Sequence, residues 1–372
     1  MPRFSRRSFL HLSAAASAAA TFRVWTEPAL AAAARRRHEP HPPGSVMIDS
    51  NENPLGPSQS ARDAMAQILP HGGRYSDELT DELVKTFADI EGLDLTYVSA
   101  TVGSTPPLAL SVLAFTSAQK SYVTADPGFE LGMMTADNNG TRVVKVPLTK
   151  THAHDVKAML AAAPDAGLFY ICNPNNPTGT LTPHSDIEYL VANKPTDAVV
   201  VVDEAYIHFT EAAPSAIDLV KSGKDVVVLR TFSKVYGLAG IRCGLLIARP
   251  DLSKRILDRG GFNFMPITAV VAATTSLRDS SLVAERRRIN AGIRQQTFQW
   301  LDQNGFTYIP SESNCFMVDV KRPGKEVRDA IAKENVFVGR IWPIMPTWVR
   351  ITVGTKDEMA KFQSAFQKVM RA

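Results

Sequence analysis

The chain has 372 residues, of which 45% are hydrophobic, and a formal net charge of +4, so it holds enough apolar material for a large buried core. Residues 1–31 contain four arginines and one glutamate, which leaves 37 basic against 36 acidic residues in the remainder. This balance excludes a strongly basic surface for nucleic-acid binding.

The N-terminal residues have the pattern of a twin-arginine signal peptide. Arg6-Arg7 stand before Ser8-Phe9-Leu10 and an Ala/Ser-rich stretch, and Ala29-Leu30-Ala31 has small residues at the spacing of a cleavage site. The apolar stretch is too short for a membrane-spanning helix, and no later stretch qualifies. We therefore expect residues 1–34 to engage the Tat export machinery and the mature protein to be periplasmic or secreted. The alternative is a basic, disordered tail.

A glycine turn comes before the first strongly apolar segment. Val102-Gly103-Ser104-Thr105 is followed by Pro106-Pro107 and the apolar residues 108–115, and proline is favoured in the first turn of a helix. Backbone N–H groups at a helix start can bind phosphate. Only Ser104 and Thr105 supply them here, because proline has none. A plain capped helix is the alternative.

Two further strand-like runs end in turns. The run 121–124 is followed by Asp126-Pro127-Gly128-Phe129, where Phe129 could stack on a flat ring or be an ordinary core residue. The run 168–172 is followed by residues 173–179, in which two prolines and a glycine fix the turn. An asparagine amide held there could bind a cofactor or a substrate carboxylate. A plain Asn-Pro turn is the alternative.

The run 198–203 reads as a fully buried strand that ends in a carboxylate. Asp203 could pair with a protonated pyridine nitrogen and so keep that ring an electron sink. Tyr206 could donate a hydrogen bond to a phenolic oxygen on the same ring. The alternatives are a helix N-cap for Asp203 and a half-buried structural tyrosine.

The most informative segment is 231–242, Thr-Phe-Ser-Lys-Val-Tyr-Gly-Leu-Ala-Gly-Ile-Arg, which comes just after the apolar run 225–229. A lysine at a strand end, Lys234, can form a Schiff base with an aldehyde. The hydroxyl residues beside it and Arg242 can hold a phosphate. Pyridoxal 5′-phosphate is an aldehyde that carries a phosphate, and it is the cofactor predicted.

Strand-like runs alternate with helical or turn segments along the middle of the chain, at residues 121–124, 142–147, 168–172, 198–203, 226–230 and 243–248. This alternation predicts an α/β fold with a mainly parallel sheet and helices on both faces. The cofactor motifs follow strand ends, where such sheets bind ligands.

We expect a large domain over residues 70–265 and a smaller α+β domain over 266–372. An N-terminal arm, residues 46–69, should join the smaller domain. The smaller domain should end in a helix that a capping box opens at Thr355. The cysteines, three in number, are too few for a disulfide framework. His152-Ala-His-Asp reads as a polar loop, so no metal site is predicted.

These motifs together resemble the fold type I pyridoxal-phosphate aminotransferases of class I/II, most closely the histidinol-phosphate aminotransferase family. The resemblance runs from about Val46 to the C-terminus, and its motifs lie in the family's order. They are Asn51 to Ser58, Arg74-Tyr75, Asn173 to Gly179, Asp203 to Tyr206, Thr231 to Arg242 and Val349 to Thr355. The resemblance implies a seven-stranded sheet and a homodimer.

The resemblance also implies cofactor-binding roles. Lys234 would form the aldimine link and then move protons, Asp203 would pair with the pyridine nitrogen, and Phe129 would stack on the ring. Tyr206 and Asn176 would bind the phenolic oxygen. The phosphate would be bound by Ser104, Thr105, Thr231, Ser233 and Arg242, with Tyr75 reaching it from the neighbouring subunit.

On the substrate side, Arg350 would grip the α-carboxylate as a bidentate fork, and Asn314 would help to hold it. Arg340 stands where the family binds the substrate phosphate. Trp342 and Pro343 beside it make the neighbourhood more apolar than a phosphate pocket.

The implied reaction is transamination, in which an amino group moves between an amino acid, or an amino-alcohol phosphate such as histidinol phosphate, and a 2-oxo acid by a ping-pong mechanism. A decarboxylase or lyase on the same scaffold is the second interpretation. A non-catalytic binding protein is the third, although such a protein has no chemical need for Lys234, Asp203 and Arg242 together.

Overall fold

The computed structural model describes residues 41–260 and 264–371. Residues 46–372 form one compact unit, distinct from residues 1–45, and the fold below is that of the larger unit. The predicted signal peptide, residues 1–34, lies outside the described residues. Within the described ranges, every helix is too short or too polar to cross a membrane.

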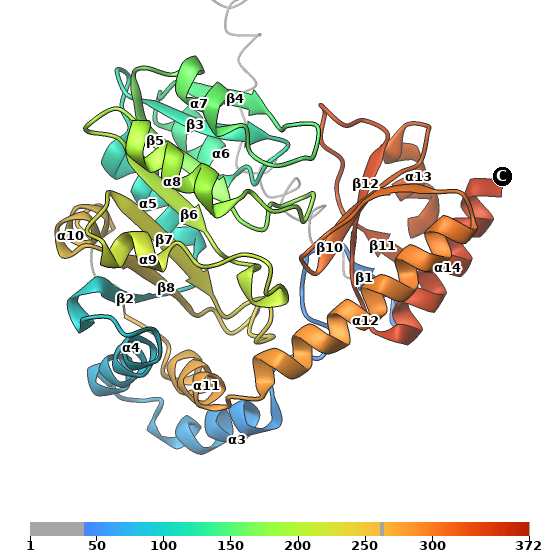
Figure 1. Cartoon of the computed structure of the whole chain (residues 1–372). Helices are drawn as coiled ribbons and strands as arrows, with labels where there is room; N and C mark the ends of the chain where they lie inside the picture. The colour runs from blue at the N-terminus through green and yellow to red at the C-terminus, as the bar shows by residue number, and fades with distance from the viewer. Residues whose placement is uncertain (1–40, 261–263, 372) are drawn as a thin grey trace, which may run out of the picture. The chain divides into compact units, whose positions relative to one another are not determined.

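A seven-stranded sheet forms the centre of the first of two cores (Figure 1). Neighbouring strands pair in parallel from β4 to β7, whereas β8 runs antiparallel to both β7 and β2. In spatial order the strands are β2 (Val98–Thr101), β8 (Gly244–Ala248), β7 (Val226–Thr231), β6 (Val199–Asp203), β5 (Ala166–Cys172), β3 (Ser121–Asp126) and β4 (Val143–Pro147).

The sheet confirms the predicted α/β fold, and its composition explains why it is buried. Every residue of β5, β6 and β7 is buried, and β6 is a run of four valines before Asp203. Such β-branched runs suit strands that are covered on both faces. Six of the seven strands coincide with the strand-like runs of the sequence. The seventh, β2, is only four residues long and reads Val-Ser-Ala-Thr, which is too short for its alternation of apolar and polar residues to be distinctive.

Helices cover both faces of this sheet. Figure 1 shows α8 and α9 in front of it and α5 behind it, and α5 and α8 both contact β6. The covering helices are α5 (Thr105–Phe115), α6 (Leu131–Asn138), α7 (Val156–Ala162), α8 (His184–Asn193), α9 (Ile217–Lys221) and α10 (Pro250–Leu257).

A second core lies between a three-stranded antiparallel sheet, a parallel two-stranded pair and three helices. The three strands are, in spatial order, β12 (Trp348–Thr352), β10 (Cys315–Asp319) and β9 (Thr307–Ile309). The parallel pair is β1 (Val46–Ile48) with β11 (Val336–Val338). The helices are α12 (Leu282–Gln303), α13 (Gly324–Ala332) and α14 (Lys356–Arg371).

The last helix, α14, begins with the capping box that the sequence predicts. The backbone N–H of Glu358 donates to Thr355 Oγ1 at 3.2 Å, and the backbone N–H of Thr355 donates to Glu358 Oε2 at 2.7 Å. Met359, Phe362 and Phe366 on its apolar stripe are buried in the second core. Local pattern and tertiary packing therefore agree in this element.

Three helices beside β2 belong to the first core or pack against it. They are α3 (Gln59–Ile68), α4 (Asp77–Glu91) and α11 (Ile267–Arg278). Helix α11 contacts α3 and α4, because its many alanine and threonine residues permit close packing. Residues 59–68 and 267–278 thus lie with the large domain here, whereas the sequence interpretation assigned both ranges to the smaller one.

Candidate active site

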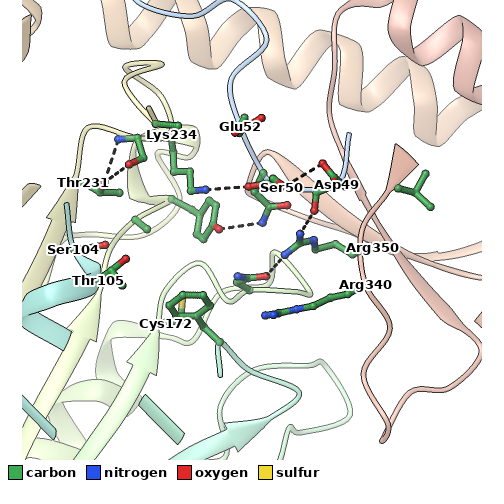
Figure 2. Close-up of a pocket in the computed structure, with 18 of the residues that line it drawn as sticks. Asp49, Ser50, Glu52, Ser104, Thr105, Cys172, Thr231, Lys234, Arg340 and Arg350 are labelled. Atoms are coloured by element: carbon green, nitrogen blue, oxygen red, sulfur yellow. Dashed lines mark hydrogen bonds between the residues drawn. The ribbon is translucent and has the colours of Figure 1, made fainter. Parts of the chain in front are cut away.

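A pocket of about 780 Å³ opens at the carboxyl ends of three neighbouring strands (Figure 2). Cys172, Asp203 and Thr231, the last residues of β5, β6 and β7, line it. The opposite wall comes from the second core and from residues 49–52, which follow β1. The site therefore lies at the edge of the parallel sheet where ligands of such folds bind.

Most of the residues that the sequence singles out meet in this pocket. Those that line it are Ser104, Thr105, Phe129, Asn176, Asp203, Tyr206, Thr231, Ser233, Lys234, Arg242, Arg340 and Arg350. Two others do not. Tyr75 is 83% exposed and its ring lies 5.0 Å from that of Phe264. Asn314 is buried behind the pocket wall, where its Nδ2 donates to the carbonyl of Asn51 at 3.0 Å.

Lys234 extends from the turn after β7 toward the N-terminal segment. Its Nζ donates to the carbonyl of Ser50 at 3.3 Å and lies 5.6 Å from the ring centre of Tyr206. Burial of the amine, together with the positive charge of Arg350, lowers the pKa of Lys234 from 10.5 to about 8. The neutral, nucleophilic form of the amine is therefore a far larger fraction near neutral pH than it is for an ordinary lysine.

Asp203 is a buried carboxylate. Tyr170 donates to its Oδ2 at 2.9 Å, and the backbone N–H of Ala205 donates to its Oδ1 at 3.1 Å. Burial raises the pKa of Asp203 to about 6, against the opposite effect of these hydrogen bonds. The next helical turn, Ile207–Phe209, begins after Tyr206, so Asp203 is not a helix N-cap. A cation placed against this carboxylate would offset the energetic cost of its desolvation.

A buried ion pair holds the ends of β6 and β7 together below the pocket floor formed by Asp203 and Thr231. Arg230, next to Thr231, donates through Nε to Glu204 Oε2 at 2.6 Å, and Glu204 is next to Asp203. Ser215 and the backbone N–H of Ala216 also donate to Glu204. Because each partner would be an uncompensated buried charge without the other, the pair ties the ends of β6 and β7 together.

Hydroxyl groups and Arg242 form a cradle on the other side of Lys234. The backbone N–H of Ser233 donates to Thr231 Oγ1 at 3.1 Å, and Arg242 Nη1 donates to Ser233 Oγ at 3.3 Å. Gly103 has a φ of +83°, and a Cβ there would collide with the Arg242 guanidinium. The backbone thus approaches the arginine closely, just before helix α5 begins.

Arg350 is a buried cation in which one N–H group has no hydrogen-bond partner. Its Nη1 donates to Asn176 Oδ1 at 2.9 Å, and its Nη2 donates to the carbonyl of Asp49. Its buried Nε has no hydrogen-bond partner, and among the described residues no carboxylate lies within ion-pair distance of it. A buried guanidinium in this state is a receptor for an anion.

Arg340 differs from Arg350 because it already has a partner. It forms an ion pair with Glu130, and its guanidinium lies 4.8 Å from the ring centre of Trp342. Trp342 is buried and donates through Nε1 to the carbonyl of Gly128 at 3.0 Å. Trp342 thus packs beneath Arg340 without lining the pocket, whose lining here comes from Phe337, Val338 and the ion-paired Arg340.

Sequence reasoning missed two parts of this site. The Asn51 to Ser58 motif contributed to the resemblance, but nothing in the sequence indicated that residues 49–52 form a pocket wall against Lys234. Tyr170 lies inside an apolar run and gave no sign of its contact with Asp203. Alternation within that run places Tyr170 on the same face as Cys172, which was the available clue.

The fold and the side chains at its carboxyl edge define a fold type I pyridoxal-phosphate enzyme. A partly buried lysine, a buried carboxylate and a hydroxyl-arginine cradle fit the aldehyde, the ring nitrogen and the phosphate of that cofactor. Residues 45–366 match the family model of aminotransferase class I and II. The chain belongs to this family, which confirms the predicted fold class, cofactor class and transaminase activity.

Relatives whose names state an activity support the assignment of this chain to the aminotransferase family. A histidinol-phosphate aminotransferase of Moorella thermoacetica is 32% identical over 87% of this chain and 85% of its own length. One from Nitrosococcus oceani is 34% identical over 88% of this chain and 89% of its own. The crystal structure of a Sinorhizobium meliloti histidinol-phosphate aminotransferase in complex with pyridoxal-5′-phosphate is 26% identical, has a TM-score of 0.82, and covers 91% of this chain and 94% of its own.

The lowered pKa of Lys234 predicts its reactivity in the cofactor-free protein. We expect competitive acetylation of Lys234, followed by peptide mass spectrometry, to reach half its maximal rate near pH 8, because only the neutral amine reacts. Replacing Arg350 with methionine removes a neighbouring positive charge, so the midpoint should move to higher pH. A midpoint at the ordinary value of 10.5 in the wild-type protein would contradict this assignment.

Proposed function

We propose that this aminotransferase acts on α-amino substrates with an aromatic or imidazole side chain, histidinol phosphate among them, and uses a 2-oxo acid as amino acceptor. The observation that carries the proposal is the buried Arg350, which forms no ion pair with a carboxylate among the described residues, in the same pocket as Lys234 and Asp203. It supplies an anion receptor beside a nucleophilic amine. The bound cofactor supplies the electron sink that makes the Cα–H bond of the substrate breakable.

The side chains of the pocket would divide the work as follows. Asp203 would hold the proton on the pyridine nitrogen, because a buried carboxylate favours a cation against it. Lys234, once its amine is released by the incoming substrate, would take the proton from Cα and deliver it to C4′, the former aldehyde carbon of the cofactor. Its pKa of about 8 suits a general base near neutral pH. Arg350 would orient the substrate through its acidic group.

The outer pocket supports the choice of side chain. Phe337 and Val338 give this part of the pocket an apolar lining, and Glu130 already neutralises Arg340. A small acidic side chain would have to compete with Glu130 for the arginine, whereas an aromatic or imidazole ring would gain contact with Phe337. The names of the relatives from Moorella thermoacetica and Nitrosococcus oceani agree with an imidazole-bearing donor.

We further propose that the enzyme is a homodimer in which each subunit contributes Tyr75 to the other's pocket. Tyr75 lies outside its own pocket, is largely exposed, and forms a surface patch with the ring of Phe264 and the neighbouring Met265. Exposed aromatic patches commonly mark interfaces. A second copy that covers this patch could bring the phenol to its phosphate cradle.

The export of the enzyme is also a proposal. Arg6-Arg7 and the Ala/Ser-rich residues after them support a twin-arginine signal in residues 1–34. That route moves folded proteins, so the cofactor could be inserted before export.

A panel of amino donors tests the substrate class. With purified holoenzyme and 2-oxoglutarate, we expect histidinol phosphate, phenylalanine or tyrosine to have a kcat/KM at least about tenfold above that of aspartate. The Lys234→Ala variant should lose both turnover and the visible absorption band. Preference for aspartate would contradict the substrate proposal. Release of carbon dioxide without formation of glutamate would instead favour the decarboxylase alternative.

The contribution of Tyr75 is tested by cofactor binding and light scattering. We expect the mass of a dimer, and we expect Tyr75→Phe to weaken pyridoxal-phosphate affinity about fivefold by removing one hydrogen bond. Tyr189→Phe, which alters a partly exposed tyrosine of α8, is the matched control and should leave affinity unchanged. A monomeric holoenzyme of full activity would exclude a shared site.

Export is tested by replacing Arg6 and Arg7 with lysine in the full chain. In a bacterium that has the twin-arginine pathway, the wild-type chain should appear outside the cytoplasm with its first 30 or so residues removed, about where Ala29-Leu30-Ala31 stand. The double variant should remain cytoplasmic and uncut. Equal export of both chains would show that the twin arginines do not direct it.

A further inference from the structure

Asn51 lies buried in the pocket wall and has an unusual backbone. Its φ of +54° is in the left-handed region, which asparagine adopts more readily than most residues with a side chain. Its carbonyl accepts a hydrogen bond from Asn314 Nδ2 at 3.0 Å, and only 1% of its surface is exposed. A strained residue at a functional site, held by several contacts, invites the question of what it positions.

The hydrogen bonds of Asn51 fix the orientation of its side-chain amide. The backbone N–H of Asn51 donates to Thr352 Oγ1 at 3.0 Å, and the Thr352 hydroxyl donates in turn to Asn51 Oδ1 at 3.0 Å. The amide oxygen therefore faces Thr352. The amide nitrogen faces the opposite way, where it donates to the Tyr206 hydroxyl at 3.0 Å and to Cys315 Sγ at 3.1 Å. Both of its protons are then in use.

This orientation determines where the proton of Tyr206 can go. An amide NH₂ group only donates, so the Tyr206 oxygen is the acceptor in its contact with Asn51. The hydroxyl proton of Tyr206 must then point to some other acceptor, and Tyr206 lines the pocket. The charged and titratable groups that act on this phenol are Arg350, Cys172 and Cys315, with the Lys234 amine 5.6 Å from its ring centre.

We propose that Asn51 is a positioning residue that directs the hydroxyl proton of Tyr206 into the pocket, toward the phenolic oxygen of the bound cofactor. The inference rests on the proposed function, since it needs pyridoxal phosphate in this pocket. By accepting from Asn51, the Tyr206 hydroxyl becomes a donor of defined direction. A donor aimed at the phenolic oxygen stabilises its anion and so lowers the pKa of the protonation change that alters the visible absorption.

The arrangement also links Tyr206 to the second core. Thr352 is the last residue of β12 and Asn314 stands just before β10, and both hold Asn51. The direction of a hydroxyl on the large sheet is thus set by residues of the smaller sheet. Asn51 is the only side chain among the described residues that hydrogen-bonds to both Thr352 and Tyr206.

Asn51→Asp is the sharpest test, because the aspartate keeps the shape and can still accept from Thr352, but cannot donate to Tyr206. The Tyr206 hydroxyl would then turn and donate to the new carboxylate. We expect the pKa of the absorption change in the holoenzyme to rise, by about one unit for the lost hydrogen bond and by a further amount for the added negative charge.

A double-mutant cycle with Tyr206→Phe separates these two contributions. In the Tyr206→Phe background, Asn51→Asp should produce only the charge effect, so its shift should be smaller by about one unit. Asn53→Asp adds the same charge two residues away. Asn53 contacts the carbonyl of Val235 and has no hydrogen bond to Tyr206, so its shift should be equal in both backgrounds. Equal shifts for Asn51→Asp in both backgrounds would overturn the proposal.

A second variant and the wild-type absorption band complete the test. If Asn51→Asp does not fold, as judged by thermal unfolding, Thr352→Val removes the hydroxyl that orients the amide and should raise the same pKa only when Tyr206 is present. If the wild-type protein shows no pyridoxal-phosphate band that depends on Lys234, the proposed function fails and this inference fails with it. A normal wild-type band with no coupling between positions 51 and 206 overturns this inference alone.

Discussion

The site depends on the burial of two groups of opposite charge at one edge of a parallel sheet. Withdrawal from water pushes both Asp203 and Lys234 toward their neutral forms, raising the pKa of the first to about 6 and lowering that of the second to about 8. Such groups are useful only if they cannot move apart or become hydrated. The valine run of β6 and the buried Arg230–Glu204 pair hold the strand ends on which they stand.

The contacts around Asp203 and Lys234 orient the other side chains of the pocket. Arg350 enters from the second core with one nitrogen unpaired, and Asn51 orients Tyr206 from the segment after β1. Arg350 stands on the smaller sheet, and Thr352 of the same sheet holds Asn51. The larger sheet carries Asp203 and Thr231, so the pocket is built from residues of both sheets.

Sequence alone predicts the parts of this arrangement that local pattern encodes. Strands β5 to β8 are buried apolar runs, Asp203 and Thr231 end two of them and Lys234 follows, so their convergence at one edge is a geometric consequence of parallel pairing. Contacts between distant segments leave no such pattern. Asn51 meets Thr352 across 301 positions, α11 packs with α3, and Asn314 supports the pocket wall instead of lining the pocket. Tyr75 lies outside the pocket and is largely exposed.

The contact between Asn51 and Thr352 has a consequence for biosynthesis. Asn51, in the wall of the pocket, leaves the ribosome about 300 positions before Thr352, the residue that holds it. A nascent chain can assemble the seven-stranded sheet, with Lys234 at its edge, while the wall opposite that lysine still lacks this support. The pocket can therefore close only after β12 has been synthesised.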